Sequence, residues 1–138
     1  MSARFFIDTN VLVYANAVDA PAKRAVARRV LDEALSSGLG CLSTQILQEF
    51  FVAVTRKLGV SADHARRQLE ILGGLPTLVV DRELVLGAVD LHRLHRLSFW
   101  DALVVRSAAV ARCATLLTED LAHGAVIDGV RVVDPFRE

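Results

Sequence analysis

Short apolar runs alternate along this chain with longer stretches in which apolar residues recur every three or four positions. The short runs lie at 4–7, 41–42, 77–80, 115–118 and 130–133. Most of them are continuously apolar, which is typical of parallel strands buried on both faces. The longer stretches predict helices over 21–35, 44–58, 61–72, 81–95 and 98–113. This alternation predicts an α/β fold with a central parallel sheet of about five strands and helices on both faces, as one domain over residues 1–138.

The composition supports a packed domain and excludes several classes of protein. Hydrophobic residues make up 53% of the chain, so a core is available, and some apolar surface is expected at an interface. Cys41 and Cys113 are too few for a disulfide framework or a zinc site, and we expect both to be reduced and buried. Because no apolar run approaches membrane-spanning length and Asp8 interrupts the N-terminal run, we expect a cytoplasmic protein without membrane contact.

The charges balance, with 16 basic and 16 acidic side chains. Fourteen of the basic residues are arginines, and several form local groups at 24–29, 66–67 and 93–96. Such groups can hold phosphates through paired hydrogen bonds. Pairing with neighbouring acids on solvated helix faces is the simpler explanation for each group.

Four acidic residues occupy positions where a carboxylate is unusual. Asp8 and Asp120 follow the first and fourth predicted strands, and the carboxyl ends of parallel strands share one edge of a sheet. Glu49 interrupts the apolar face of a helix, where an unpaired carboxylate is costly. Asp101 lies in the first turn of a helix that begins at Ser98. Taken singly, each acid is explained as a helix cap, a loop residue or a salt-bridge partner.

Taken together, the four acids predict a metal site. Carboxylates about 4 Å apart repel each other by roughly 4 kcal/mol at an effective dielectric constant of about 20, so a cation is needed between them. Hard oxygen ligands of this kind suit Mg²⁺ or Mn²⁺. Such an ion can acidify a water molecule and stabilise the charge that develops on a phosphate. Phosphodiester hydrolysis is the reaction that uses this arrangement most naturally.

The segments around these acids resemble the motifs of PIN-domain ribonucleases, especially the VapC-type toxins of type II toxin–antitoxin systems. The matching segments are, in order, residues 6–14, 43–50, 98–104 and 117–121. The ending Val133-Asp134-Pro135-Phe136 is similar to the family's Asn-Pro-Phe tail, with Asp in place of Asn. The resemblance spans essentially the whole chain and implies a PIN-like fold.

The resemblance also implies an activity, a site and partners. The activity would be that of a Mg²⁺- or Mn²⁺-dependent endoribonuclease, a hydrolase. The catalytic and metal-binding residues would be Asp8, Glu49, Asp101 and Asp120. The supporting groups around them would be Thr9, Asn10, Thr118 and Glu119. The partners would be an RNA substrate, a cognate antitoxin protein and a second copy of the chain in a homodimer.

The sequence is open to several other interpretations. A nuclease of RNA processing or decay without an antitoxin fits the same residues, and so does a silent module that binds RNA or protein, although four acids argue against the latter. Receiver and phosphotransferase domains need a lysine after a late strand, whereas the last lysine is Lys57. His92 and His95 lack a third metal ligand at suitable spacing. Trp100 can stack on a base, but core packing is its simpler use.

Overall fold

Six strands form one sheet in the computed structural model, which describes residues 3–137. The strands are β1 (Phe5–Ile7), β2 (Gly40–Ser43), β3 (Thr77–Leu78), β4 (Thr115–Leu117), β5 (Val126–Ile127) and β6 (Val130–Val133). Their order across the sheet is β3-β2-β1-β4-β6-β5. All neighbours are parallel except β5 and β6, which pair antiparallel. The predicted, mainly parallel α/β sheet is confirmed.

Six helices within residues 3–137 connect and cover the strands. They are α1 (Thr9–Tyr14), α2 (Pro21–Ser37), α3 (Thr44–Lys57), α4 (Ala62–Leu72), α5 (Arg82–His95) and α6 (Phe99–Val110). Most begin where the sequence predicts a cap. The side chains of Ser43, Ser61, Asp81 and Ser98 each accept a hydrogen bond from the backbone N–H three residues later.

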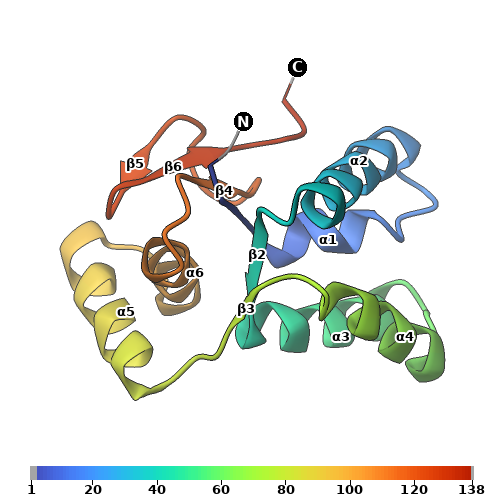
Figure 1. The fold of residues 1–138 in the computed structure, drawn as a ribbon, viewed down its shortest axis with the longest axis horizontal. Helices are drawn as coiled ribbons and strands as arrows, with labels where there is room; N and C mark the ends of the chain where they lie inside the picture. Colours follow the sequence, from blue (N-terminus) through green and yellow to red (C-terminus); the bar gives the residue numbers. More distant parts are fainter. Residues whose placement is uncertain (1–2, 138) are drawn as a thin grey trace.

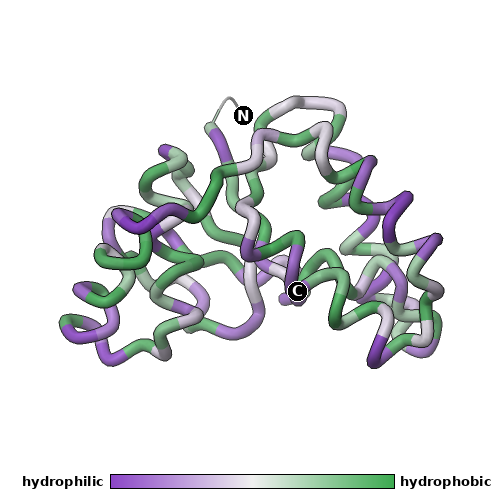
Figure 2. Tube along the Cα trace, turned by 90° about the horizontal axis from the view of Figure 1, so that it is seen from below, coloured by the Kyte–Doolittle hydropathy of each residue, from purple (hydrophilic) through white to green (hydrophobic). Residues whose placement is uncertain are grey.

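The helices lie on both sides of the sheet, as predicted. Helices α5 and α6 lie on one side and α1 to α4 on the other (Figure 1). The strands between them contribute fully buried residues such as Phe6, Leu42 and Leu116. Figure 2 shows apolar residues toward the middle of the molecule, and hydrophilic residues alternating with apolar ones along the outer helices. No helix among residues 3–137 combines the length and the apolarity that crossing a bilayer requires.

The sixth strand, β5, was missed by the sequence prediction. It is only two residues long, and its Val126 is exposed, so it lacks the buried apolar run of the other strands. It forms a hairpin with β6 through Asp128 and Gly129, whose φ angles are 52° and 79°. Two positive φ angles in a two-residue turn are characteristic of Asp-Gly hairpins. The Asp128-Gly129 pair is therefore the sequence signal from which this hairpin could have been predicted.

The two cysteines are buried and are not joined in a disulfide, as expected. Burial raises the pKa of the Cys113 thiol, and the neighbouring Cys41 thiol raises it further. A thiol held in its protonated form is a poor nucleophile. Both residues therefore act as small apolar side chains within the fold.

Candidate active site

Asp8 follows the carboxyl end of β1 and caps α1. Its side chain is 6% exposed and accepts three hydrogen bonds. The Oδ1 atom accepts from the Thr9 backbone N–H at 2.7 Å, and Oδ2 accepts from the Thr118 hydroxyl at 2.8 Å and the Asn10 amide at 3.3 Å. Asp8 is therefore both the N-cap of α1 and a member of the candidate site.

The surroundings of Asp8 disfavour its charged form. Burial raises the pKa of Asp8 to about 6, against the lowering effect of the hydrogen bonds from Thr118 and Thr9. The nearby carboxylates of Asp120 and Glu49 also raise this pKa. No ion pair among residues 3–137 involves any of these three acids. Their charges are left without a cationic side chain.

Asp120 is joined to Asp8 by two polar side chains. The Asn10 Nδ2 atom lies 2.9 Å from Asp120 Oδ2, 3.1 Å from Thr118 Oγ1 and 3.3 Å from Asp8 Oδ2. The Thr118 hydroxyl accepts from the Asp120 backbone N–H at 3.1 Å while it donates to Asp8. Two of the predicted supporting residues therefore bridge two of the predicted acids.

Glu49 joins the same set from α3. Its Oε1 atom accepts a 2.7 Å hydrogen bond from the Thr9 hydroxyl, and its Oε2 atom accepts from Gln45 Nε2 at 3.3 Å. The alternative expectation, that Glu49 is a salt-bridge partner of Arg56 or another arginine, is wrong among the described residues, where Glu49 belongs to no ion pair. Gln45 Nε2 also lies 3.4 Å from the Trp100 carbonyl, so one buried amide positions both Glu49 and the start of α6.

Glu119 has a different environment, in a group that we call the lysine cluster: Tyr14, Lys23, Glu119 and Phe136. Lys23 Nζ forms a 2.8 Å ion pair with Glu119, and the Tyr14 hydroxyl donates to the same carboxylate at 2.8 Å. Lys23 Nζ also lies 4.6 Å from the centre of the Tyr14 ring and 5.3 Å from that of Phe136. The hydrogen bond to Glu119 is the main cause that raises the pKa of Lys23. The sequence predicted no role for Lys23, which lies outside the motifs, and none for Tyr14, although Tyr14 ends the first motif.

Asp101 lies outside this connected set. Its backbone N–H donates to Ser98 Oγ at 3.1 Å, which confirms the predicted cap. Its carboxylate forms no hydrogen bond or ion pair with another residue of the described range 3–137. Across that range, no three His, Cys, Asp or Glu side chains are grouped closely enough to hold a metal as they stand. The structure thus connects Asp8, Glu49 and Asp120 and leaves Asp101 apart.

A groove of about 1060 Å³ opens beside these acids. One wall is formed by α1, including Thr9, Asn10 and Tyr14, and the other by the face of α3 that carries Glu49. Asp120 and Trp100 also line it. Trp100 is 62% exposed, so the expectation that it packs in the core is wrong. The groove gives a large ligand access to Glu49 and Asp120, whereas Asp8 is buried behind its lining residues.

The donor set fits a hard divalent cation. The connected groups include carboxylates and hydroxyls, the oxygen ligands that Mg²⁺ and Mn²⁺ prefer, and none of the three carboxylates is paired with a cationic side chain among residues 3–137. The other candidates have ordinary surface roles. His92 and His95 are exposed, and the His92 ring hydrogen-bonds with the Leu97 carbonyl.

The mainly parallel α/β sheet carries acids at its carboxyl edge, and comparison with known proteins defines the class of protein. The sequence pattern of the PIN domain family matches residues 5–126. The chain therefore belongs to the PIN domain family, and the resemblance drawn from its motifs is confirmed. No curated protein is detectably similar in sequence.

The fold is shared with several solved structures, two of which are the following. A chain of a toxin–antitoxin complex from Klebsiella pneumoniae has a TM-score of 0.69 and 22% identity, over 94% of this chain and 96% of that one. VapC20 of Mycobacterium tuberculosis, a toxin that cleaves the sarcin-ricin loop, has a TM-score of 0.64 and 21% identity, over 84% of this chain and 91% of that one. At this level of identity the likeness concerns the fold.

Proposed function

We propose that this protein is a Mg²⁺- or Mn²⁺-dependent endoribonuclease and the toxin of a type II toxin–antitoxin pair. The observation that carries the proposal is the connected set of Asp8, Glu49 and Asp120, three acids without a cationic partner among residues 3–137, beside an open groove. A fold that needed these acids only as caps or ion pairs would not concentrate them at one edge. Membership of the PIN domain family supports the same assignment.

In this proposal the residues have distinct tasks. Asp8 and Asp120 would hold the cation, and Asp101 would reach it through water, because its carboxylate lies outside the connected set. When bound, the ion would acidify a water molecule and offset charge that develops on the phosphate. Glu49, oriented by the Thr9 hydroxyl and by Gln45, would share ligation or orient that water.

The supporting residues would fix the acids before the ion binds. Asn10 and Thr118 hold Asp8 and Asp120 toward each other against their repulsion. The backbone N–H of Glu119 donates to Asn10 Oδ1 at 3.3 Å, which in turn fixes the orientation of the Asn10 amide. Such preorganisation lowers the cost of assembling the site when metal and substrate arrive.

Toxin identity, an antitoxin and a homodimer belong to the proposal as well. The toxin and antitoxin assignments are supported by the fold shared with a chain of a toxin–antitoxin complex and with a toxin that cleaves the sarcin-ricin loop. Exposed apolar side chains of α5, among them Leu86 and Leu94, offer surface for a protein partner. An RNA-processing nuclease without an antitoxin remains the alternative. A small neighbouring gene for an antitoxin would separate the two.

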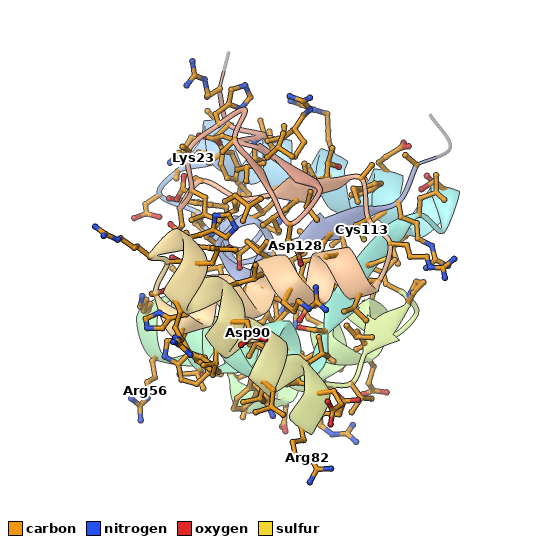
Figure 3. The ribbon with its side chains drawn as sticks, turned by 90° about the vertical axis from the view of Figure 1, so that its left-hand side faces the viewer. Lys23, Arg56, Arg82, Asp90, Cys113 and Asp128 are labelled. Atoms are coloured by element: carbon orange, nitrogen blue, oxygen red, sulfur yellow. The ribbon has the colours of Figure 1, made fainter. Side chains whose placement is uncertain are left out.

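The experiment that tests the activity is cleavage of a mixed cellular RNA pool by the purified protein with Mg²⁺, Mn²⁺ or EDTA. Asp101→Asn is compared with Asp90→Asn, a matched control on the exposed side of α5 (Figure 3). We expect cleavage that requires metal, is lost in Asp101→Asn and is kept in Asp90→Asn. Equal cleavage by the two variants would contradict the four-acid mechanism, and absence of metal-dependent cleavage by folded wild-type protein would contradict the nuclease assignment.

A further inference from the structure

We propose that Gln45 is a positioning residue that couples Glu49 on α3 to the first turn of α6, where Asp101 lies. Through this coupling Gln45 would place Asp101, the acid outside the connected set, relative to the other three. The inference rests on the proposed function, since it assigns a further residue to the same site.

The Gln45 amide joins two helices that lie on opposite sides of the sheet (Figure 1). Gln45 lies in the first turn of α3, and its Nε2 atom is 3.3 Å from Glu49 Oε2, one turn further along the same helix. The same nitrogen is 3.4 Å from the carbonyl oxygen of Trp100 in α6. No other hydrogen bond among residues 3–137 joins α3 to α6. The amide therefore sets where α6 begins relative to Glu49.

Stability alone does not explain a glutamine at this position. Gln45 is 4% exposed, and its Oε1 atom has no hydrogen-bond partner within the described part of the chain. A buried amide oxygen without a donor costs free energy, and an apolar side chain of the same shape would avoid that cost. Turning the amide over would place Oε1 against two acceptors, Glu49 Oε2 and the Trp100 carbonyl. The two contacts of the NH₂ group are thus the better explanation of the residue.

Neither acceptor depends on Gln45 for its first hydrogen bond. Glu49 accepts the 2.7 Å hydrogen bond from the Thr9 hydroxyl through its other oxygen. Trp100 lies in the first turn of α6, where a carbonyl has an intrahelical donor four residues later. Gln45 therefore adds a link between the two groups, and through this link a movement of one is passed to the other.

Asp101 is the residue that this link would control. It follows Trp100 directly, and its carboxylate forms no hydrogen bond or ion pair with another residue of the range 3–137. Its place is set by the backbone of the first turn of α6, which Ser98 caps and Gln45 holds. Residues that orient metal-binding side chains without touching the ion are commonly needed for affinity or activity.

The first test follows the start of α6 by fluorescence. Trp100 is the only tryptophan of the chain, so its emission reports on this turn. The full-length protein is titrated with Mg²⁺ in the absence of RNA. In wild type, we expect the emission to change over the same Mg²⁺ range in which the melting temperature rises. Gln45→Met keeps the length of the side chain but removes the NH₂ group, and it should lose most of the emission change while Mg²⁺ still raises the melting temperature.

Gln48→Met is the matched control for this titration. Gln48 is an exposed glutamine of the same helix that also lines the groove, and its side chain forms no hydrogen bond among the described residues. It should keep the emission change of wild type. An equal loss of the change in the two variants would contradict a specific role of Gln45.

The second test separates positioning from substrate binding and from folding. Gln45→Met should lower kcat for RNA cleavage roughly 10- to 100-fold and change KM by less than about threefold, because the amide contacts an acid and a backbone carbonyl. Its melting temperature in EDTA should equal or exceed that of wild type, since the unpaired oxygen is gone. A raised KM with unchanged kcat, or a large fall in the metal-free melting temperature, would contradict the positioning role.

Failure of this inference differs from failure of the proposed function. Metal-dependent cleavage that is unchanged in Gln45→Met, or a Trp100 emission that does not respond to stabilising Mg²⁺, would overturn the coupling and leave the nuclease. An emission change that requires Gln45, without cleavage of RNA in Mg²⁺ or Mn²⁺, would support the coupling and overturn the nuclease. Neither a stability gain nor an emission change with Mg²⁺ would overturn both.

Discussion

Near the carboxyl edge of the sheet, Glu119 of the lysine cluster lies next to the connected set of Asp8, Glu49 and Asp120. The partners of the two differ. In the lysine cluster, Glu119 meets Lys23 at 2.8 Å and the Tyr14 hydroxyl at 2.8 Å. One residue further, Asp120 meets an asparagine amide, and through it Asp8, with no cation among the described residues. Lys23 thus neutralises the charge of Glu119, whereas no cationic side chain of the described residues neutralises the charges of Asp8 and Asp120.

Under the proposed function, this difference indicates which acids would bind the metal. A carboxylate that serves only the structure gains a partner within the fold, as Glu119 does. Asp8 is buried and hydrogen-bonded, yet its pKa is raised to about 6, so its charged form is not stabilised by the protein alone. A bound divalent cation would supply the missing charge.

Removing an uncompensated acid should reduce cleavage far more than removing the compensated one. We expect Asp120→Asn to lower the metal-dependent cleavage rate by roughly 100-fold or more, since the ion's stabilisation of the transition state is worth several kcal/mol. Glu119→Gln should lower it by less than about tenfold. Initial rates on one RNA substrate, with folding checked by thermal melting, measure both. Equal losses would remove the distinction between the two groups.

Without metal, stability should decrease as pH rises through the range set by Asp8. The pKa of Asp8 is raised from 3.8 to about 6, so the folded state binds this proton more tightly than the unfolded state does. Between these values the free energy of unfolding should fall by roughly 3 kcal/mol on account of this group. Chemical denaturation in EDTA from pH 4 to pH 7 measures it, as the difference between wild type and Asp8→Asn.

The Asp8→Asn variant also decides between the two roles of this residue. It should remove this pH dependence and be at least as stable as wild type at pH 7 without metal, because the buried charge is gone. A large loss of stability at pH 7 would show that Asp8 serves mainly as the cap of α1.

Bound metal should offset the destabilisation caused by the buried charge of Asp8, because the metal binds the folded state. At a concentration about 100 times its dissociation constant, Mg²⁺ or Mn²⁺ should raise the free energy of unfolding by about 2.7 kcal/mol. Asp8→Asn should lose most of this gain, and Glu119→Gln should keep it. Thermal melting with the divalent salt, against NaCl of matched ionic strength, provides the comparison. A gain that survives in Asp8→Asn would place the ion elsewhere.

The lysine cluster should matter least, because its ion pair is partly exposed. The Lys23 side chain is 43% exposed, so solvent screens the pair and Lys23→Met should cost about 1 kcal/mol or less. The loss should diminish in high salt. Arg66→Met, which breaks the more exposed pair with Glu70, should cost less still. If Lys23→Met lowered the free energy of unfolding by several kcal/mol, the lysine cluster would instead be a major source of stability.

Much of the fold was predictable because its signals are local. Buried parallel strands read as apolar runs, and Ser61 and Ser98 mark helix starts by their own side chains. The positions of Asp8 and Asp120 followed from the rule that parallel strands end at a common edge. The short strand β5 lacks such a run and was missed.

The rest of the site depends on contacts that no local pattern reveals. Lys23 and Phe136 are far apart in the sequence, and only the fold places one over the ring of the other. The exposure of Trp100 likewise depends on where α3 and α6 meet, which an apolar sequence context does not indicate. Asp101 lies in a segment, residues 98–104, that matches a motif of the family, yet its carboxylate lies outside the connected set of acids.

The most direct test of the central claim is anomalous diffraction at the manganese edge from crystals soaked in Mn²⁺. We predict an ion that contacts the carboxylates of Asp8 and Asp120, with Glu119 still paired to Lys23. Absence of an ion at these carboxylates at saturating Mn²⁺, or an ion bound to a Glu119 released from Lys23, would contradict the account.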